Sequence, residues 1–348
     1  MTVETVTRKR LQLFSGRANL PLADEVAAHL GARLGDPELV DFPNTEVRCR
    51  FSESVRGADV FIIQSHTRPT SQSIWEQLLM IDAAKRASAK RITAVCPYYG
   101  YGRQDRKSMG REPISARLVA DCLKVAGADR VLSVDLHSGQ IQGFFDGPFD
   151  HLTAATVLED YLRANASGEL VIVSPDTGRT KVMEKFATHL NAGTAVVDKR
   201  RDPATGAVTT RGVLGDVDGR MCVIVDDEID TAGTICQAAE RVAAAGASDI
   251  WAVATHGVLS DPAVDRLKNS PISRVVVTNT VPIPPEKEFD KLEVVSVSRV
   301  IADAIDAVFE DSSVSEIFGG ENQACVGRQP EVAARMRGGG TRVGDRRR

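Results

Sequence analysis

The stretch MCVIVDDEIDTAGTICQ, residues 221–237, constrains the fold of this chain more than any other. Five apolar residues, 221–225, run without a polar interruption and end at the paired acids Asp226 and Asp227. This is the pattern of a buried parallel strand that reaches its carboxyl end. Ligands of parallel α/β sheets bind outside the carboxyl ends of the strands, so we expect a binding crevice there.

The residues after the two acids predict a seat for a phosphate group. A turn of small and hydroxyl residues leads into a predicted helix at 235–245, and it leaves backbone N–H groups uncovered at the start of that helix. Ionised carboxylates only accept hydrogen bonds, so Asp226 and Asp227 suit the vicinal hydroxyls of a sugar. The alternative to a binding role is that the acids are merely solvated beside a capped helix. The turn of hydroxyl residues and glycine that follows argues against this alternative. The turn consists of Asp230, Thr231, Ala232, Gly233 and Thr234.

Length and composition bound the class of protein. At 348 residues the chain is too long for one ordinary core, and two domains of about 150 residues each are expected. The net charge of −4 gives no general attraction to nucleic acid or to anionic membranes. Six scattered cysteines without C-x-x-C spacing indicate buried thiols in a reducing compartment. No apolar run approaches the roughly 18 residues of a membrane span, and the N-terminus lacks a signal-peptide core, so we expect a cytoplasmic protein.

The order of strand, hydroxyl-rich loop, helix and strand occurs twice. Residues 60–96 follow the same layout as residues 221–255, with Gln64 and Ser65 where Asp226 and Asp227 stand. The simplest account is a duplicated α/β domain whose first copy has lost the sugar-binding acids. We therefore predict domains at 9–150 and 151–320, divided near the turn-rich stretch 143–148. An Arg- and Gly-rich tail at 321–348 is expected to be disordered.

Three further segments carry residues suited to phosphate chemistry. The segment 97–113 interleaves aromatics, glycines and cations, and its size fits a nucleotide phosphate chain better than a nucleic-acid groove, although an exposed basic loop is the alternative. His137 and Asp176 each follow a predicted strand and can share a divalent cation, although Asp176 also fits a helix N-cap. Three successive cations at 199–201 precede Pro203 and Gly206, which predicts a mobile cationic hairpin rather than a merely solvated charge run.

These segments together resemble a known family. VIVDDEIDTAGT resembles the phosphoribosyl-diphosphate binding motif of the phosphoribosyltransferase superfamily. FPNTE, GYGRQDRK, REPISARL, VDLHSGQIQGFFDGP, SPDTG and DKRR, in this order, are similar to ribose-phosphate diphosphokinases of the phosphate-activated, Mg-dependent class. The match runs from about residue 13 to residue 318. It implies an α/β fold of two tandem phosphoribosyltransferase-like domains, each a mostly parallel sheet flanked by helices.

The resemblance also implies an activity and a role for each motif. The activity is transfer of the diphosphoryl group of MgATP to ribose 5-phosphate, with inorganic phosphate as activator. Lys199 and Arg201 would form the catalytic flap, and His137 and Asp176 would bind magnesium. Ribose 5-phosphate would be held by Arg201, Asp226, Asp227, Asp230, Thr231, Ala232, Gly233 and Thr234. ATP would be held by Asn44, Thr45, Glu46, Arg103 and Gln104.

Members of this family are usually hexamers built from dimers, which implies a homo-oligomer whose ATP site is reached across a subunit contact. An allosteric phosphate or ADP site is implied at Ser54, Arg56, Ser313, Ser315 and Phe318. Nucleic acid and membrane are not expected partners. The chain departs from the family pattern at Gly102 and Arg179 and in its Arg-rich tail.

Two alternatives stay open on the sequence alone. A phosphoribosyltransferase that consumes PRPP needs only the central motif and a base-binding hood, and the intact FPNTE, GYGRQD and DKRR segments argue against it. A catalytically silent regulatory subunit on the same fold would be favoured by loss of the DKRR flap, which here carries both cations.

Overall fold

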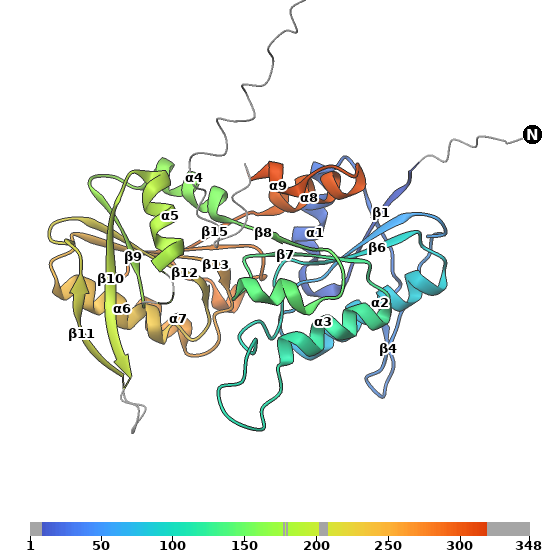
Figure 1. The fold of residues 1–348 in the computed structure, drawn as a ribbon, viewed down its shortest axis with the longest axis horizontal. Helices are drawn as coiled ribbons and strands as arrows, with labels where there is room; N and C mark the ends of the chain where they lie inside the picture. The colour runs from blue at the N-terminus through green and yellow to red at the C-terminus, as the bar shows by residue number, and fades with distance from the viewer. Residues whose placement is uncertain (1–8, 177, 179, 202–207, 319–348) are drawn as a thin grey trace, which may run out of the picture.

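The computed structural model of the chain describes residues 9–176, 178, 180–201 and 208–318, and it contains two mostly parallel sheets that lie side by side (Figure 1). The first sheet has the order β2-β1-β5-β6-β7-β8, and all of its neighbours are parallel. Its strands are β1 (Leu11–Ser15), β2 (Leu34–Gly35), β5 (Asp59–Ile63), β6 (Arg91–Cys96), β7 (Arg130–Val134) and β8 (Phe149–Leu152).

The second sheet has the order β11-β10-β9-β12-β13-β14-β15 and is parallel except for β11, which pairs antiparallel with β10. Its strands are β9 (Leu170–Ser174), β10 (Gly193–Arg201), β11 (Val208–Leu214), β12 (Met221–Ile229), β13 (Asp249–Gly257), β14 (Arg274–Thr278) and β15 (Leu292–Val295). A separate hairpin is formed by β3 (Val40–Asp41) and β4 (Val47–Arg48).

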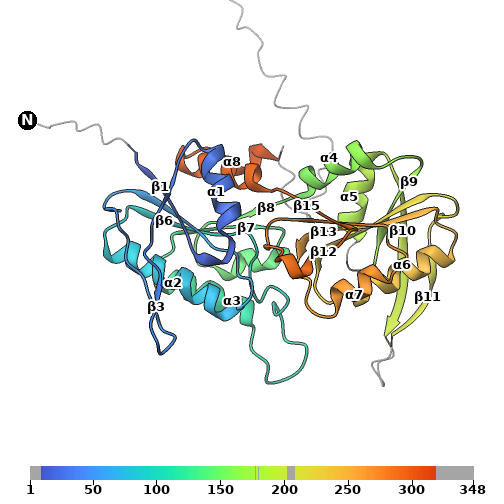
Figure 2. The ribbon, with the colours of Figure 1, turned by 180° about the vertical axis from the view of Figure 1, so that it is seen from behind.

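Helices cover both faces of each sheet (Figures 1 and 2). On the first sheet, α2 (Thr70–Arg86) and α3 (Ser115–Ala126) lie on one face and α1 (Leu20–His29) on the other. On the second sheet, α6 (Gly233–Ala244) and α7 (Ala263–Lys268) lie opposite α4 (Ala155–Asn165) and α5 (Thr180–Leu190). The last helices, α8 (Ser298–Phe309) and α9 (Val314–Ile317), return to the first half, where α8 packs on α1. Short 3-10 turns lie at Arg17–Asn19, Gly139–Phe144 and Pro285–Lys287.

One apolar cluster connects the two halves. Side chains alternate along β5, so Phe61 and Ile63 face this cluster while Val60 and Ile62 face the helices α2 and α3. The same cluster contains Val223 of β12, so the core is continuous from one sheet to the other. The domain boundary between residues 150 and 151 stays a prediction, and β8 runs across it while pairing with β7.

Apolar runs in the sequence also predict strands at 11–15, 40–46, 91–96, 170–174 and 274–278, and all of these except 40–46 have the predicted bounds. The prediction that the central strand ends at Val225 is wrong. β12 continues to Ile229 because Asp226, Glu228 and Ile229 pair with residues of the equally long β13. The predicted strand at 40–46 is also too long, since β3 ends at Asp41. The tail at 321–348 lies outside the described residues.

The described residues bear on two predictions from the sequence, one about membrane spans and one about cysteines. Among the described helices, none is long and apolar enough to cross a membrane. The five cysteines in the described ranges are all free thiols, namely Cys49, Cys96, Cys122, Cys222 and Cys236.

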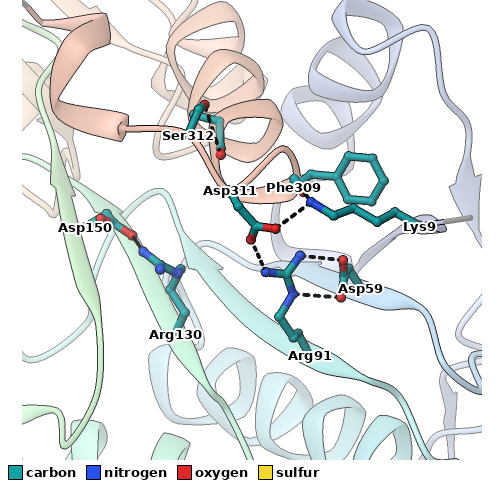
Figure 3. A network of polar contacts seen from close by, with 9 residues as sticks. Lys9, Asp59, Arg91, Arg130, Asp150, Phe309, Asp311 and Ser312 are labelled. Atoms are coloured by element: carbon teal, nitrogen blue, oxygen red, sulfur yellow. Dashed lines mark hydrogen bonds and ion pairs between the residues drawn. The ribbon is translucent and has the colours of Figure 1, made fainter. Parts of the chain in front are cut away.

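Charged side chains join the two ends of the chain beside the first sheet (Figure 3). Arg91 donates from Nε and Nη2 to the buried carboxylate of Asp59, at 2.8 and 2.6 Å. Another nitrogen of Arg91 pairs with Asp311, which follows α8 and also accepts from Lys9 Nζ at 2.5 Å. Hydrogen bonds from Lys9 and from Arg91 lower the pKa of Asp311 to about 2. Arg91 therefore connects the edge of the sheet with the end of α8.

We predict that Arg91→Ala lowers the free energy of unfolding by roughly 1–3 kcal/mol, because it leaves the buried Asp59 carboxylate without its cation, while the partial exposure of Arg91 screens the loss. The measurement is urea denaturation. Arg86→Ala is the matched control, since Arg86 makes an exposed ion pair with Asp82 on α2. Equal midpoints for the two variants would contradict the prediction.

Candidate active site

The carboxyl ends of strands from both sheets meet in the middle of the molecule. Ser65, just after β5, donates to the carbonyl oxygen of Thr280, just after β14, at 2.6 Å. Thr255 of β13 donates from Oγ1 to Asp135 Oδ2 at 2.7 Å. His256 Nε2 lies 3.0 Å from the Asp135 carbonyl oxygen, which accepts its proton. The carboxyl ends of the two sheets are therefore joined by direct hydrogen bonds.

Asp135 directly follows β7 and contacts the second sheet through Thr255 and His256. Its φ of 36° lies in the left-handed region, and its carboxylate accepts from the backbone N–H of Ala154 at 2.9 Å. Two residues later, His137 Nδ1 lies 2.7 Å from Asp227 Oδ2. The Asp227 side chain is 7% exposed, so this contact pairs a largely desolvated carboxylate with a ring from the opposite half.

A second group of contacts surrounds Arg103, in the loop after β6. Arg103 Nη1 lies 2.9 Å from Asp230 Oδ2 and 3.3 Å from Glu228 Oε1. Tyr98 donates from its hydroxyl to Glu228 Oε2 at 3.2 Å. Burial and the neighbouring Asp227 charge raise the pKa of Glu228, and burial raises the pKa of Tyr98. Burial opposes protonation of Arg103, but Glu228 and Asp230 outweigh it and raise the pKa of the guanidinium.

The turn at 230–234 leads into the N-terminus of α6. Ala232 is the N-cap residue of α6, with a left-handed φ of 59°, and it has no polar side chain to occupy the first N–H groups of the helix. Arg266 supports the turn from behind by donating from Nη1 to the Thr231 carbonyl at 2.9 Å. Thr231 and Thr234 are exposed on the outer side of the turn.

A cavity of about 440 Å³ opens beside β12, between this strand and the helices α4 and α5. Asp226 and Asp227 line one part of it, and Asp135 and Thr255 line the part contributed by the strand ends around β7 and β13. The acids after Val225 therefore border an enclosed volume of the size that a small ligand requires.

The corresponding strand end of the first sheet is filled by protein contacts. Gln64 is buried, donates from Nε2 to the Ser73 carbonyl at 3.1 Å, and accepts from the Ala18 N–H at 3.2 Å. Ser65 is equally buried and bonded to Thr280. The polar groups of this loop are used within the protein.

Several predicted site residues come together, and others do not. Arg103, His137, Asp227 and Asp230 are joined by the contacts above. Gln104 follows Arg103, and its Oε1 accepts from Ser115 Oγ at 2.6 Å. The ATP-binding candidates Asn44, Thr45 and Glu46 are exposed on the β3–β4 hairpin, at the outer edge of the first sheet (Figure 1).

The structure describes only part of the segments that carry the candidate metal ligand Asp176 and the candidate flap residues. Asp176 Oδ1 accepts from the Gly178 N–H at 2.8 Å, in a turn before α5. Arg179, where the chain departs from the family pattern, lies outside the described residues. No group of three or more His, Cys, Asp or Glu side chains in the described ranges is arranged to hold a metal ion. Lys199 and Arg201 lie on β10, where their backbones pair with Thr210 and Val208, as a hairpin requires. Residues 202–207 lie outside the described ranges.

The allosteric candidates lie on two segments. Ser54 and Arg56 are exposed before β5, and their carbonyl oxygens accept from Arg10 Nη2 at 2.7 and 3.1 Å. Ser313 and Ser315 are exposed at α9, while Phe318 is buried and lines the cavity beside β12.

Sequence reasoning missed four residues of this site, namely Tyr98, Asp135, Glu228 and Thr255. Glu228 stands third in a row of acids, and its place in that row could have marked it as a candidate site residue. Tyr98 lies in the aromatic segment 97–113 without a feature that separates it from its neighbours. Asp135 and Thr255 act across the two sheets, and no local pattern reports such a contact.

Comparisons with known proteins agree with this architecture. The family model described as the N-terminal domain of ribose phosphate pyrophosphokinase matches residues 11–127, and the phosphoribosyl synthetase-associated domain matches residues 207–319. A ribose-phosphate pyrophosphokinase of Streptomyces avermitilis is 54% identical over 91% of this chain and 98% of its own length. One of Bifidobacterium longum is 56% identical over 89% of this chain and 93% of its own length.

A solved structure extends the likeness to three dimensions. The crystal structure of phosphoribosylpyrophosphate synthetase from Mycobacterium smegmatis has a TM-score of 0.83 at 51% identity, and the match covers 87% of this chain and 100% of that one. The resemblance inferred from the ordered motifs is confirmed, and so is the α/β fold with two mostly parallel sheets flanked by helices. The chain belongs to the ribose-phosphate pyrophosphokinase family of enzymes.

Proposed function

We propose that this chain transfers the β,γ-diphosphoryl group of MgATP to the anomeric hydroxyl of ribose 5-phosphate, giving PRPP and AMP. The observation that carries this proposal is the ion pair between Arg103 and Asp230. Arg103 belongs to the segment that we assign to ATP, and Asp230 opens the turn that we assign to the sugar phosphate. The two substrates would therefore lie on either side of one contact between the sheets.

The sugar side of the site is built on β12 and α6. Asp226 and Asp227 line the cavity and can accept hydrogen bonds from the two ribose hydroxyls. The N–H groups at the start of α6, with Thr231 and Thr234, would hold the 5-phosphate. The first sheet offers no equivalent seat at Gln64 and Ser65, whose polar groups are bonded within the protein.

The reaction needs positioning and charge compensation more than covalent catalysis. The anomeric oxygen attacks the β-phosphorus in line, an O–P bond forms, and the bond from that phosphorus to the oxygen of AMP breaks. The anomeric hydroxyl loses its proton in the same process. Both substrates are anionic, so the cations Arg103, Lys199 and Arg201 would stabilise the charge that develops, and no protein nucleophile is required.

Magnesium would enter with the triphosphate. Mg²⁺ is usually held by one or two protein ligands together with substrate phosphates and waters, and the Asp176 carboxylate is a donor of the kind that it prefers. The protein donors would be the Asp176 carboxylate and Nε2 of His137, whose Nδ1 faces Asp227. When bound, the ion would neutralise charge on the β- and γ-phosphate oxygens.

We also propose that the working enzyme is a homo-oligomer. The β3–β4 hairpin that carries Asn44, Thr45 and Glu46 is exposed, and Val40 and Phe42 on it are 43% and 44% exposed. Exposed apolar side chains on a projecting hairpin suit a contact with a second copy, whose ATP site the hairpin would then complete. The segments with Ser54, Arg56, Ser313, Ser315 and Phe318 would bind activating phosphate or inhibitory ADP.

The decisive experiment incubates the purified protein with ATP, ribose 5-phosphate and Mg²⁺, with and without inorganic phosphate, and measures AMP and PRPP. Formation of both in equal amounts supports the proposal. A second mixture contains PRPP and a nucleobase in place of ATP and ribose 5-phosphate, and consumption of PRPP there, with no AMP in the first mixture, would instead indicate a phosphoribosyltransferase. Absence of AMP under phosphate activation would indicate a silent subunit.

We predict that Asp226→Asn raises KM for ribose 5-phosphate about 10- to 30-fold, since the variant loses a charged acceptor for a sugar hydroxyl. KM for ATP should stay within about twofold of its original value. Steady-state kinetics with each substrate varied in turn measures both. Asp303→Asn, an exposed position on α8, is the control. The assignment of the sugar side fails if the two variants have the same KM for ribose 5-phosphate.

We predict that Lys199→Ala lowers kcat by ~10² to 10³ and changes KM for either substrate much less, because the flap cation acts on charge that develops during the reaction. Lys181→Ala, on α5, is the control. An unchanged kcat in Lys199→Ala would remove the flap from the mechanism.

A further inference from the structure

Resting on the proposed function, we infer that Glu228 is a positioning residue that holds Arg103 in the orientation required to bind the triphosphate of ATP. Glu228 lies between the proposed sugar ligands Asp227 and Asp230 in the sequence, yet its side chain contacts Arg103 and Tyr98 of the other half. Both of its oxygens face residues of the loop after β6.

Glu228 is fixed on a rigid element. Its backbone pairs with His256 in the interior of the second sheet, and its side chain is only 9% exposed. Tyr98 donates to Oε2, and the ring of Tyr98 meets the ring of His256 edge-on at 4.9 Å between centroids. The carboxylate is therefore held from two directions and leaves Oε1 for Arg103.

Arg103 is the more exposed partner in this arrangement. Its side chain is 57% exposed, and within the described ranges its ion pairs with Glu228 and Asp230 both use Nη1. A guanidinium carries five N–H donors in a planar fork. With Nη1 held by carboxylates, Nε and Nη2 form an edge that suits two phosphate oxygens.

Glu228 is better suited to this role than the other acids nearby. Asp227 pairs with His137, and Asp230 is more exposed and belongs to the turn proposed to bind the sugar phosphate. Burial and the Asp227 charge raise the pKa of Glu228, and the nearby His256 and Arg103 oppose that rise.

The test compares Glu228→Gln, Glu228→Met and Tyr98→Phe with the control Glu240→Gln, an exposed position on α6. We expect Glu228→Met to raise KM for MgATP about tenfold, Glu228→Gln less, and Tyr98→Phe about two- to threefold. KM for ribose 5-phosphate should be unchanged. The Kd of MgATP, measured by calorimetry without the sugar, should rise in the same order.

A double-mutant cycle separates positioning from a general structural effect. If Glu228 acts through Arg103, Glu228→Gln should change the Kd of MgATP by less than about twofold in an Arg103→Ala background. Additive effects, or a Kd in Glu228→Gln and Tyr98→Phe equal to that of the control, would overturn the inference. Because the Kd needs no turnover, absence of PRPP formation by the unmodified enzyme would overturn the proposed function separately.

Discussion

Pairing of polar groups across the meeting edges of two parallel sheets is the constraint on which the rest of this structure depends. The side chains of Asp227 and Glu228 are only 7% and 9% exposed, Asp135 is half-buried, and an isolated buried carboxylate is costly. Each finds its partner in the opposite half, in Thr255, His137 and Arg103. The site therefore needs both halves of the chain in their mutual arrangement.

The same pairing resolves an electrostatic problem. Four acids stand at 226–230, although the substrates proposed for this family member carry phosphates. Carboxylates repel phosphates and attract hydroxyls and cations. In the proposed arrangement the acids would face the sugar or hold cations in place, while backbone N–H groups and arginines would bind the anions. A strongly acidic strand end is thereby compatible with anionic ligands.

Sequence reasoning recovers what local periodicity encodes. Uninterrupted apolar runs such as 170–174 and 274–278 define buried parallel strands with correct bounds. Strand pairing can extend a strand beyond the point where the side chains become polar. β12 continues through three acids because β13 offers hydrogen bonds along its whole length. Local patterns predicted the acids but not their partners. Tyr98 reaches Glu228 over 130 positions of sequence, and such a contact leaves no periodic trace.

The packing of α8 on α1 has a consequence for how the chain is made. Leu22 and Val26 of the first helix share a core with Ile301 and Ile305 near the end of the described chain. During synthesis from the N-terminus, these apolar side chains are complete long before their cover exists. A ribosome must add some 270 residues before the first helix is shielded, so the nascent first half exposes apolar surface until α8 has been made.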